Sequence, residues 1–170
     1  MMTPPAGTKA ILPPKGLLIA LVAQIPLVLA SLPLRPSLAE IAAGILLLAA
    51  GIAINVWAER QFRHAGVGVC PFSPAPIVVE SGPYRITRNP MYVGLVALCL
   101  STVLLSGVPL NSWTAAAYAF WLHRRFVLPE ERFLLGERGE AYAAYARRVP
   151  RWIRRSPSPR AAPPPPRARR

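Results

Sequence analysis

Between two long apolar segments the chain runs Glu80-Ser81-Gly82-Pro83-Tyr84-Arg85-Ile86-Thr87-Arg88-Asn89-Pro90-Met91-Tyr92-Val93-Gly94. Gly82-Pro83 is a turn signal. Asn89-Pro90 predicts a helix start, with Asn89 as the N-cap and Pro90 at the first helical position, where a missing N–H costs nothing. The helix that it opens, 91–110, is almost wholly apolar. The stretch therefore places two arginines and a helix cap where a membrane helix meets water, which suits an anionic small molecule.

The composition and the charge point to a one-domain membrane protein. The chain has 170 residues, 53% of them hydrophobic, and its apolar residues are clustered. The net charge is +13, and most of the 20 basic residues lie after Leu122. A basic tail can bind nucleic acid or anionic lipid; beside apolar spans we expect anionic lipid headgroups and no nucleic acid. Cys70 and Cys99 have neither disulfide nor metal-site spacing, so we expect no bound metal.

Four apolar runs predict the helices that cross the membrane: 16–34, 41–58, 91–110 and 113–122. The fourth run is too short to cross alone, but residues 126–128 can complete it if Arg124 and Arg125 snorkel or face a pocket. An uncharged turn at 107–112 joins the last two runs into a helical hairpin. We therefore expect an all-α integral membrane protein with about four transmembrane helices, this hairpin and a cytoplasmic C-terminal helix.

The basic residues also predict the orientation. Lysines precede the first run, one arginine lies in the first short loop, and four arginines lie in the loop 59–90. The turn near Asn111 has no charge. Both termini and the 59–90 loop of this multi-pass protein are therefore expected in the cytoplasm. We expect 1–15 to be a disordered N-terminus, 16–155 to form the membrane domain, and 156–170 to be a disordered Pro/Arg-rich tail.

Polar residues at the end of the second run allow two interpretations. Asn55 and Glu59 lie one helical turn apart, after glycines and alanines that favour close helix packing in lipid. They either form a polar helix end at the interface or face a polar pocket. Residues 60–88 are expected to form a loop of roughly 30 residues, and loops of that length are usually functional or disordered. His64 is expected to be solvated within it.

The segment after the fourth run predicts a helix that can meet this loop on the cytoplasmic face. Pro129 suits the start of a helix, and Glu130 and Glu131 are favourable in its first turn because of the helix dipole. An aromatic and apolar stripe at helical spacing follows, made of Tyr142, Tyr145 and Val149.

The candidate chemistry is limited by what the sequence lacks. It has no Gly-rich phosphate loop, no nucleophile elbow and no zinc signature, and its histidines are His64 and His123. Hydrolysis is therefore poorly supported. The arginines, the carboxylates and the tyrosines suit a ligand that carries a carboxylate, an ammonium and a ribose beside an apolar cleft. A group transfer without a side-chain nucleophile fits, and so does a non-enzymatic membrane scaffold.

Two motifs resemble the signature of the isoprenylcysteine carboxyl methyltransferase family, which is related to the membrane phospholipid N-methyltransferases. The first is Gly82-Pro83-Tyr84-Arg85 followed by Arg88-Asn89-Pro90-Met91-Tyr92-Val93-Gly94. The second comprises Glu130, Glu131, Gly139, Tyr142, Tyr145, Val149, Arg151 and Trp152. Phe62 with Ala65-Gly66 resembles a weaker preceding motif. The family often has His at the position of Asn89, Phe at that of Arg138 and Thr at that of Val67.

The resemblance implies a multi-span α-helical enzyme that uses S-adenosylmethionine in a cytoplasmic pocket and takes a lipophilic acceptor from the bilayer. One wall of the pocket would consist of Tyr84, Arg88, Asn89, Pro90, Tyr92 and Gly94. The opposite wall would consist of Glu130, Glu131, Tyr142 and Tyr145.

Roles follow for the residues that would carry the reaction. Arg88 would hold the cofactor's carboxylate, and Glu130 or Glu131 its ammonium or ribose hydroxyls. Asn89 would orient a backbone segment or the acceptor, and Glu131 or a water would take a proton from an amine acceptor. The expected function is methyl transfer most like isoprenylcysteine carboxyl O-methylation, with phospholipid or small-molecule N-methylation as the alternative. The oligomeric state stays open.

Overall fold

The computed structural model describes residues 13–31, 35–66 and 78–153, and this part of the chain is all-helical, as predicted. The expected disorder of residues 1–12 and 156–170, the lipid contacts of the basic tail, and Val67 and Cys70 lie outside these ranges. The disorder expected at residues 13–15 is wrong, because a helix begins at Pro13. The elements are α1 (Pro13–Ala30), α2 (Leu38–His64), the 3₁₀ helix η1 (Gly82–Arg85), α3 (Pro90–Ser106), the 3₁₀ helix η2 (Pro109–Asn111), α4 (Ser112–Leu122), the π-helix η3 (His123–Val127) and α5 (Leu128–Arg148).

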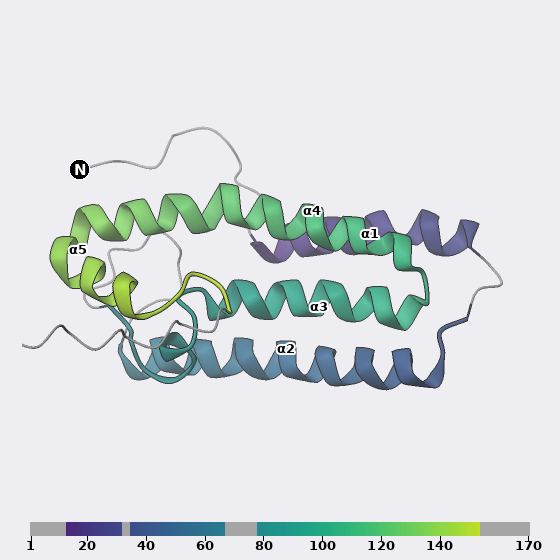
Figure 1. Ribbon diagram of the computed structural model, residues 1–170, viewed down its shortest axis with the longest axis horizontal. Coiled ribbons are helices and arrows are strands. Elements are labelled where there is room, and N and C mark those ends of the chain that lie inside the picture. The colour runs from purple at the N-terminus through teal and green to yellow at the C-terminus, as the bar shows by residue number, and fades with distance from the viewer. Residues whose placement is uncertain (1–12, 32–34, 67–77, 154–170) are drawn as a thin grey trace, which may run out of the picture.

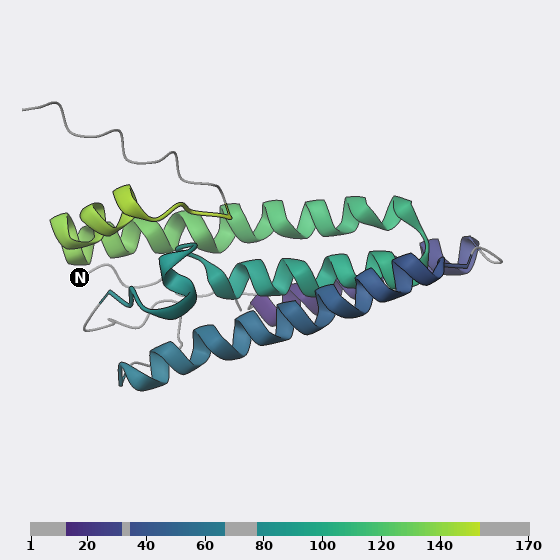
Figure 2. The same ribbon diagram turned by 60° about the horizontal axis from the view of Figure 1, so that its bottom comes forward.

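The helices form an elongated bundle in which α3 is central. It contacts α1, α2 and α4, and the predicted α3–α4 hairpin is present, with the two helices antiparallel (Figure 1). Both views place α5 at the end of the bundle where α2 ends and α3 begins (Figure 1, Figure 2). The two halves of the sequence signature therefore meet at that end.

The helix formed by the second apolar run begins earlier and ends later than predicted. A capping box between Ser37 and Glu40 starts α2, and the helix runs to His64 because no breaker precedes Gly66. The prediction that 60–88 is a loop is therefore wrong at both ends, since it contains the last turn of α2 and the helix η1. His64 is exposed, as expected.

The third run ends earlier than predicted. Gly107 adopts the left-handed conformation, with φ 65°, and stops α3 at Ser106 instead of residue 110. A Cβ at this position would also lie 2.7 Å from the backbone N of Pro36. The turn after α3 thus packs closely against the chain that enters α2.

The predicted helix is present as α5, with Pro129, Glu130 and Glu131 in its first turn as expected, but no break separates it from the helix before it. The helix that begins at Ser112 continues through η3 into α5, where Pro129 lies in the first turn. The change of direction comes at Gly139, with φ 49° and ψ −123°, values that favour glycine. This reversal brings Tyr142, Tyr145 and Val149 back as one buried cluster, so the predicted stripe is confirmed.

Two helices among the described residues, α1 and α2, are long and apolar enough to cross a membrane, and α3 is a shorter apolar helix. Their outward faces expose large apolar side chains, including Leu18, Ile25, Leu46 and Ile52. Exposed apolar surface of this extent marks contact with lipid or protein.

The two interpretations of Asn55 and Glu59 are resolved separately. The Asn55 side-chain amide donates to the Gly51 carbonyl oxygen over 2.9 Å and lies against Gly94 of α3, in a helix–helix contact. Glu59 pairs with Arg63 on the exposed side of α2. Asn55 therefore serves packing, and Glu59 is a polar helix end.

Candidate functional site

Four hydrogen bonds, which we call the junction, join residues 84–89 to residues 145–151. The Arg88 backbone N–H donates to the Pro150 carbonyl oxygen over 2.9 Å. The Thr87 hydroxyl and the Asn89 side-chain amide both donate to the Arg151 carbonyl oxygen, over 2.9 and 3.0 Å. The Tyr145 hydroxyl donates to the Tyr84 carbonyl oxygen over 2.8 Å. Segments more than sixty residues apart are thus fixed to each other.

Asn89 occupies the N-cap position of α3, as predicted, but its side chain does not cap the helix. The amide is instead used at the junction, on the Arg151 carbonyl oxygen. Pro90 is buried at the start of the helix, where it needs no hydrogen-bond acceptor.

Glu131 is held by two arginines. Arg151 donates to both of its carboxylate oxygens, from Nε over 2.9 and 3.0 Å and from a terminal nitrogen over 2.6 Å. A terminal nitrogen of Arg88 lies 3.3 Å from the same carboxylate. The side chains of Glu131 and Arg88 are each only 12% exposed. Because Glu131 and Arg88 have little contact with water, removing one of the two charges would leave the other buried without its partner.

Glu130, the adjacent carboxylate, has a different environment. Its Oε2 accepts a 2.9 Å hydrogen bond from the Tyr92 hydroxyl. Burial raises the pKa of Glu130 to about 7, the Tyr92 hydrogen bond opposes this rise, and the charge of Glu131 adds to it. The two adjacent carboxylates therefore lie in different surroundings, Glu131 beside arginines and Glu130 beside a phenol.

Arg88 retains a free donor at this site. Its Nε is buried and has no hydrogen-bond partner within the described residues. The ring of Tyr142 lies next to that of Tyr145, with centroids 6.0 Å apart. Burial raises the pKa of Tyr142 to about 12, so this phenol stays neutral. An anionic ligand group could satisfy the unused guanidinium donor.

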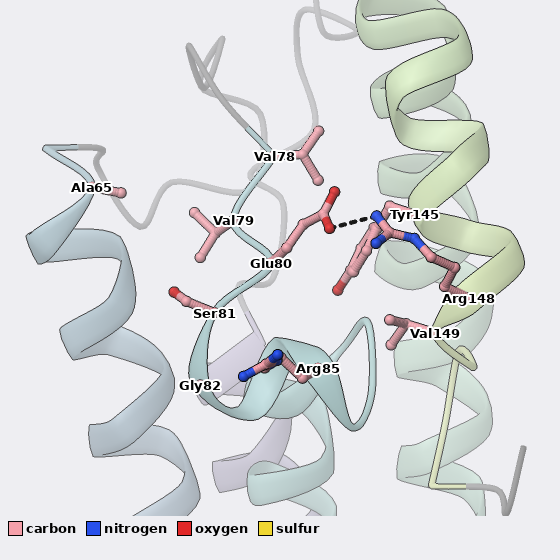
Figure 3. A pocket seen from close by; sticks show the side chains of 10 residues that line it. All are labelled: Ala65, Val78, Val79, Glu80, Ser81, Gly82, Arg85, Tyr145, Arg148 and Val149. Carbon is pink, nitrogen blue, oxygen red and sulfur yellow. Dashed lines mark hydrogen bonds and ion pairs between the residues drawn. The ribbon is translucent and has the colours of Figure 1, made fainter.

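A pocket of about 660 Å³ opens beside the junction (Figure 3). Its walls include the apolar side chains of Val78, Val79 and Val149. Glu80 and Arg148 point toward each other within it and form a 2.7 Å ion pair. This volume lies within the range typical of small-molecule sites.

The structure brings most of the predicted site residues together, while Pro90 is buried at the start of α3 and Gly94 is turned away from the others. Gly94 faces the opposite side of α3, where a Cβ would lie 2.0 Å from the Asn55 amide nitrogen and 2.9 Å from the Gly51 carbonyl oxygen. The residues gathered around the junction are Tyr84, Arg88, Asn89, Tyr92, Glu130, Glu131, Tyr142 and Tyr145.

Sequence reasoning missed four contributors to this end of the bundle. Thr87 contributes a donor and Arg151 a carbonyl acceptor to the junction. Glu80 and Arg148 line the pocket. Arg151 could have been found, because it belongs to the second motif. Glu80 and Arg148 carried no local signal, since their pairing depends on the reversal at Gly139.

Removing the Tyr145 hydroxyl should loosen the junction. Tyr145→Phe leaves the Tyr84 carbonyl oxygen without this donor, which we expect to lower the free energy of unfolding by about 1 kcal/mol. The measurement is the midpoint of thermal unfolding in detergent. A midpoint equal to that of the wild type would show that the bond contributes nothing to stability.

Fold and site together define a class: among the described residues, an all-helical protein with apolar helices and a pocket of small-molecule size at one end of the bundle. The family model described as phospholipid methyltransferase matches residues 39–138. The chain belongs to this family, which includes the isoprenylcysteine carboxyl methyltransferases. Membership supports assignment as a methyltransferase and, with the apolar helices, association with a membrane. Searches of curated proteins and of solved structures gave no match.

Methyltransferases of this family generally use S-adenosylmethionine, and the residues present fit that group. The unpartnered Nε of Arg88 suits a carboxylate. The carboxylate of Glu80, which lines the pocket, suits an ammonium or ribose hydroxyls. Arg88 and Glu130 are not among the residues that line this pocket. The pocket has apolar walls and room for a nucleoside.

Proposed function

We propose that the protein transfers a methyl group from S-adenosylmethionine to a lipophilic acceptor that enters from a bilayer. The observation that carries the proposal is the junction. It brings the arginine, carboxylate and tyrosine side chains of both motifs to one end of an apolar helical bundle, beside a pocket of about 660 Å³.

The chain's own residues have distinct roles in this proposal. Arg88 holds the cofactor's carboxylate through Nε, and Glu131 fixes the Arg88 guanidinium from the other side. Glu80 lies where it can accept hydrogen bonds from ribose hydroxyls. When bound, S-adenosylmethionine supplies an electrophilic methyl group on a sulfonium. Alignment and exclusion of water then provide much of the acceleration, without a side-chain nucleophile.

In the proposed topology the protein crosses the membrane four times. The spans are α1, α2, α3 and the continuous helix made of α4 and η3. Exposed apolar side chains on α4, such as Trp113 and Phe120, support the fourth span. Both termini and the junction lie in the cytoplasm, because the arginines concentrate at that end.

The family suggests two classes of acceptor. The motif resemblance favours an isoprenylcysteine carboxylate, and the description of the matching family model favours a phospholipid amine. A non-enzymatic membrane scaffold is the competing interpretation, and cofactor binding separates it from both.

The test is calorimetric titration of the detergent-purified protein with S-adenosylmethionine. Arg88→Ala should weaken binding at least tenfold, which corresponds to about 1.4 kcal/mol, because the buried donor is lost. Arg63→Ala is the matched control, since Arg63 is an exposed arginine paired with Glu59 on α2.

Two results would contradict the proposal. Equal affinities of Arg88→Ala and the wild type would remove Arg88 from the cofactor site. Absence of binding by folded wild-type protein would make the scaffold the leading interpretation.

A further inference from the structure

A second cavity lies on the outward face of α2, which forms one edge of the bundle (Figure 1). Its volume is about 530 Å³, and we call it the α2 groove. The residues that line it are Ala49, Ile52, Ala53, Val56, Trp57 and Arg60. All six belong to α2, and their spacing of three and four places them on one face of the helix. None of them lines the pocket beside the junction, so the α2 groove is a separate site.

The α2 groove is apolar along most of its length and ends at a charge. Ala49 and Ala53 are small, so they leave room beside the bulkier side chains that line the same face. From Ala49 to Arg60 the helix rises by about 16 Å. Half of the hydrocarbon core of a bilayer measures about 15 Å. In the proposed topology the groove therefore spans one leaflet, with Arg60 at the level of the lipid headgroups.

The charged end of the groove has no counter-ion in the protein. Arg60 is exposed. All seven acidic residues of the chain lie within the described ranges, and no ion pair joins any of them to Arg60. Arg63, about one turn further along α2, instead pairs with Glu59 over 2.7 Å. The guanidinium of Arg60 is thus available to an anion from outside the chain.

Trp57 marks the same level of the membrane. Its side chain is 45% exposed, and a Cβ at Gly82 would lie 3.0 Å from its indole nitrogen. The indole nitrogen therefore lies beside the start of η1, at the end of the bundle that carries the junction. Tryptophan is enriched at the depth of lipid headgroups because its ring is apolar and its N–H is polar.

We propose that the α2 groove binds one phospholipid with an anionic headgroup. An acyl chain lies along residues 49–56, and the phosphate contacts Arg60 beside Trp57. This lipid is not the methyl acceptor, since the groove shares no lining residue with the pocket beside the junction. In the proposed topology the Arg60 end faces the cytoplasmic leaflet, where anionic lipids provide the negative surface potential.

A second copy of the chain suits this face less well than a lipid. Two copies in one membrane share their orientation, and a two-fold contact places the same patch of both chains together. Such a contact through the α2 groove would bring the two Arg60 guanidinium groups to the same depth, where like charges repel. An anionic headgroup instead neutralises Arg60.

The test of the charged end is native mass spectrometry of the detergent-purified protein during titration with phosphatidylglycerol. Phosphatidylcholine is the comparison, because its headgroup carries a phosphate but no net charge. We expect the wild type to bind one phosphatidylglycerol more tightly than phosphatidylcholine, and Arg60→Ala to lower the affinity for phosphatidylglycerol about fivefold. Arg63→Ala is the matched control and should leave this affinity unchanged, since Arg63 already pairs with Glu59.

The test of the apolar part uses two alanines of α2. Ala53→Leu fills the groove and should lower the affinity for both lipids. Ala50→Leu is its matched control, because Ala50 is exposed on the same helix but does not line the groove. Glycerol 3-phosphate, which has the phosphate without acyl chains, should not displace phosphatidylglycerol. The midpoint of thermal unfolding of each variant shows that it is folded.

Several outcomes would overturn the inference. Equal affinity of the wild type and Arg60→Ala for phosphatidylglycerol would remove Arg60 from a headgroup site. Displacement by glycerol 3-phosphate would make the site one for a free phosphate. A dimer in detergent that Ala53→Leu separates and Ala50→Leu does not would make a second copy the occupant of the groove. Because no measurement here uses S-adenosylmethionine, the inference and the proposed function can fail independently.

Discussion

Replacing Glu131 with glutamine is expected to lower the free energy of unfolding by about 3 kcal/mol. The substitution removes the charge that Arg88 and Arg151 share, and the Arg88 side chain, only 12% exposed, loses its counter-ion. For a domain of this size the midpoint of thermal unfolding should fall by roughly 10 °C. Affinity for S-adenosylmethionine should also fall, because Arg88 is no longer fixed.

A matched variant separates this effect from general loss of charge. Glu140→Gln removes a carboxylate from the same helix, in an exposed pair with Arg147, and should change stability by less than about 1 kcal/mol. A cycle with Arg151→Ala measures the coupling directly. If Glu131→Gln unfolds at the same temperature as Glu140→Gln, the arginine pairs do not stabilise the junction.

Gly94→Ala is expected to cost about 3 kcal/mol of stability, at the upper end for overpacking. The added Cβ would lie 2.0 Å from the Asn55 amide nitrogen and 2.9 Å from the Gly51 carbonyl oxygen, so α2 and α3 must move apart. The measurement is again thermal unfolding in detergent.

The control for this substitution is Gly136→Ala, because a Cβ there meets no atom within 4 Å. Asn55→Ala combined with Gly94→Ala should recover part of the loss, since the side-chain clash is gone and the backbone contact remains. A Gly94→Ala protein as stable as Gly136→Ala would show that the helices do not need this close approach.

The sequence predicts the helices well where the signal is local. Apolar runs identified the four helices of the bundle, the uncharged turn identified the hairpin, and the glycines of the second run indicated the close contact of α2. Helix ends were less predictable. The polar last turn of α2 resembles a loop in composition, and the end of α3 depends on one left-handed glycine.

The candidate site was predictable as a set of residues but not as a set of pairs. The two motifs named the side chains that meet at the junction. Which of these side chains pair with each other could not be predicted, because the pairing depends on the reversal at Gly139. This reversal turns α5 back toward residues 80–89. The Asn89 side chain was expected to accept a cap hydrogen bond from its own helix, but it accepts none there, and its amide nitrogen donates to the distant carbonyl oxygen of Arg151.

The junction also has a consequence for the order in which the protein is made. Three of its four hydrogen bonds have their acceptors on Pro150 and Arg151, whereas the donors on Thr87, Arg88 and Asn89 are synthesised some sixty residues earlier. Because chains emerge from the ribosome amino end first, α1, α2 and α3 are complete before these acceptors exist. The end of the bundle that carries the junction is thus the last part of the described fold to assemble, and a chain interrupted before Pro150 would keep its apolar helices without a finished junction.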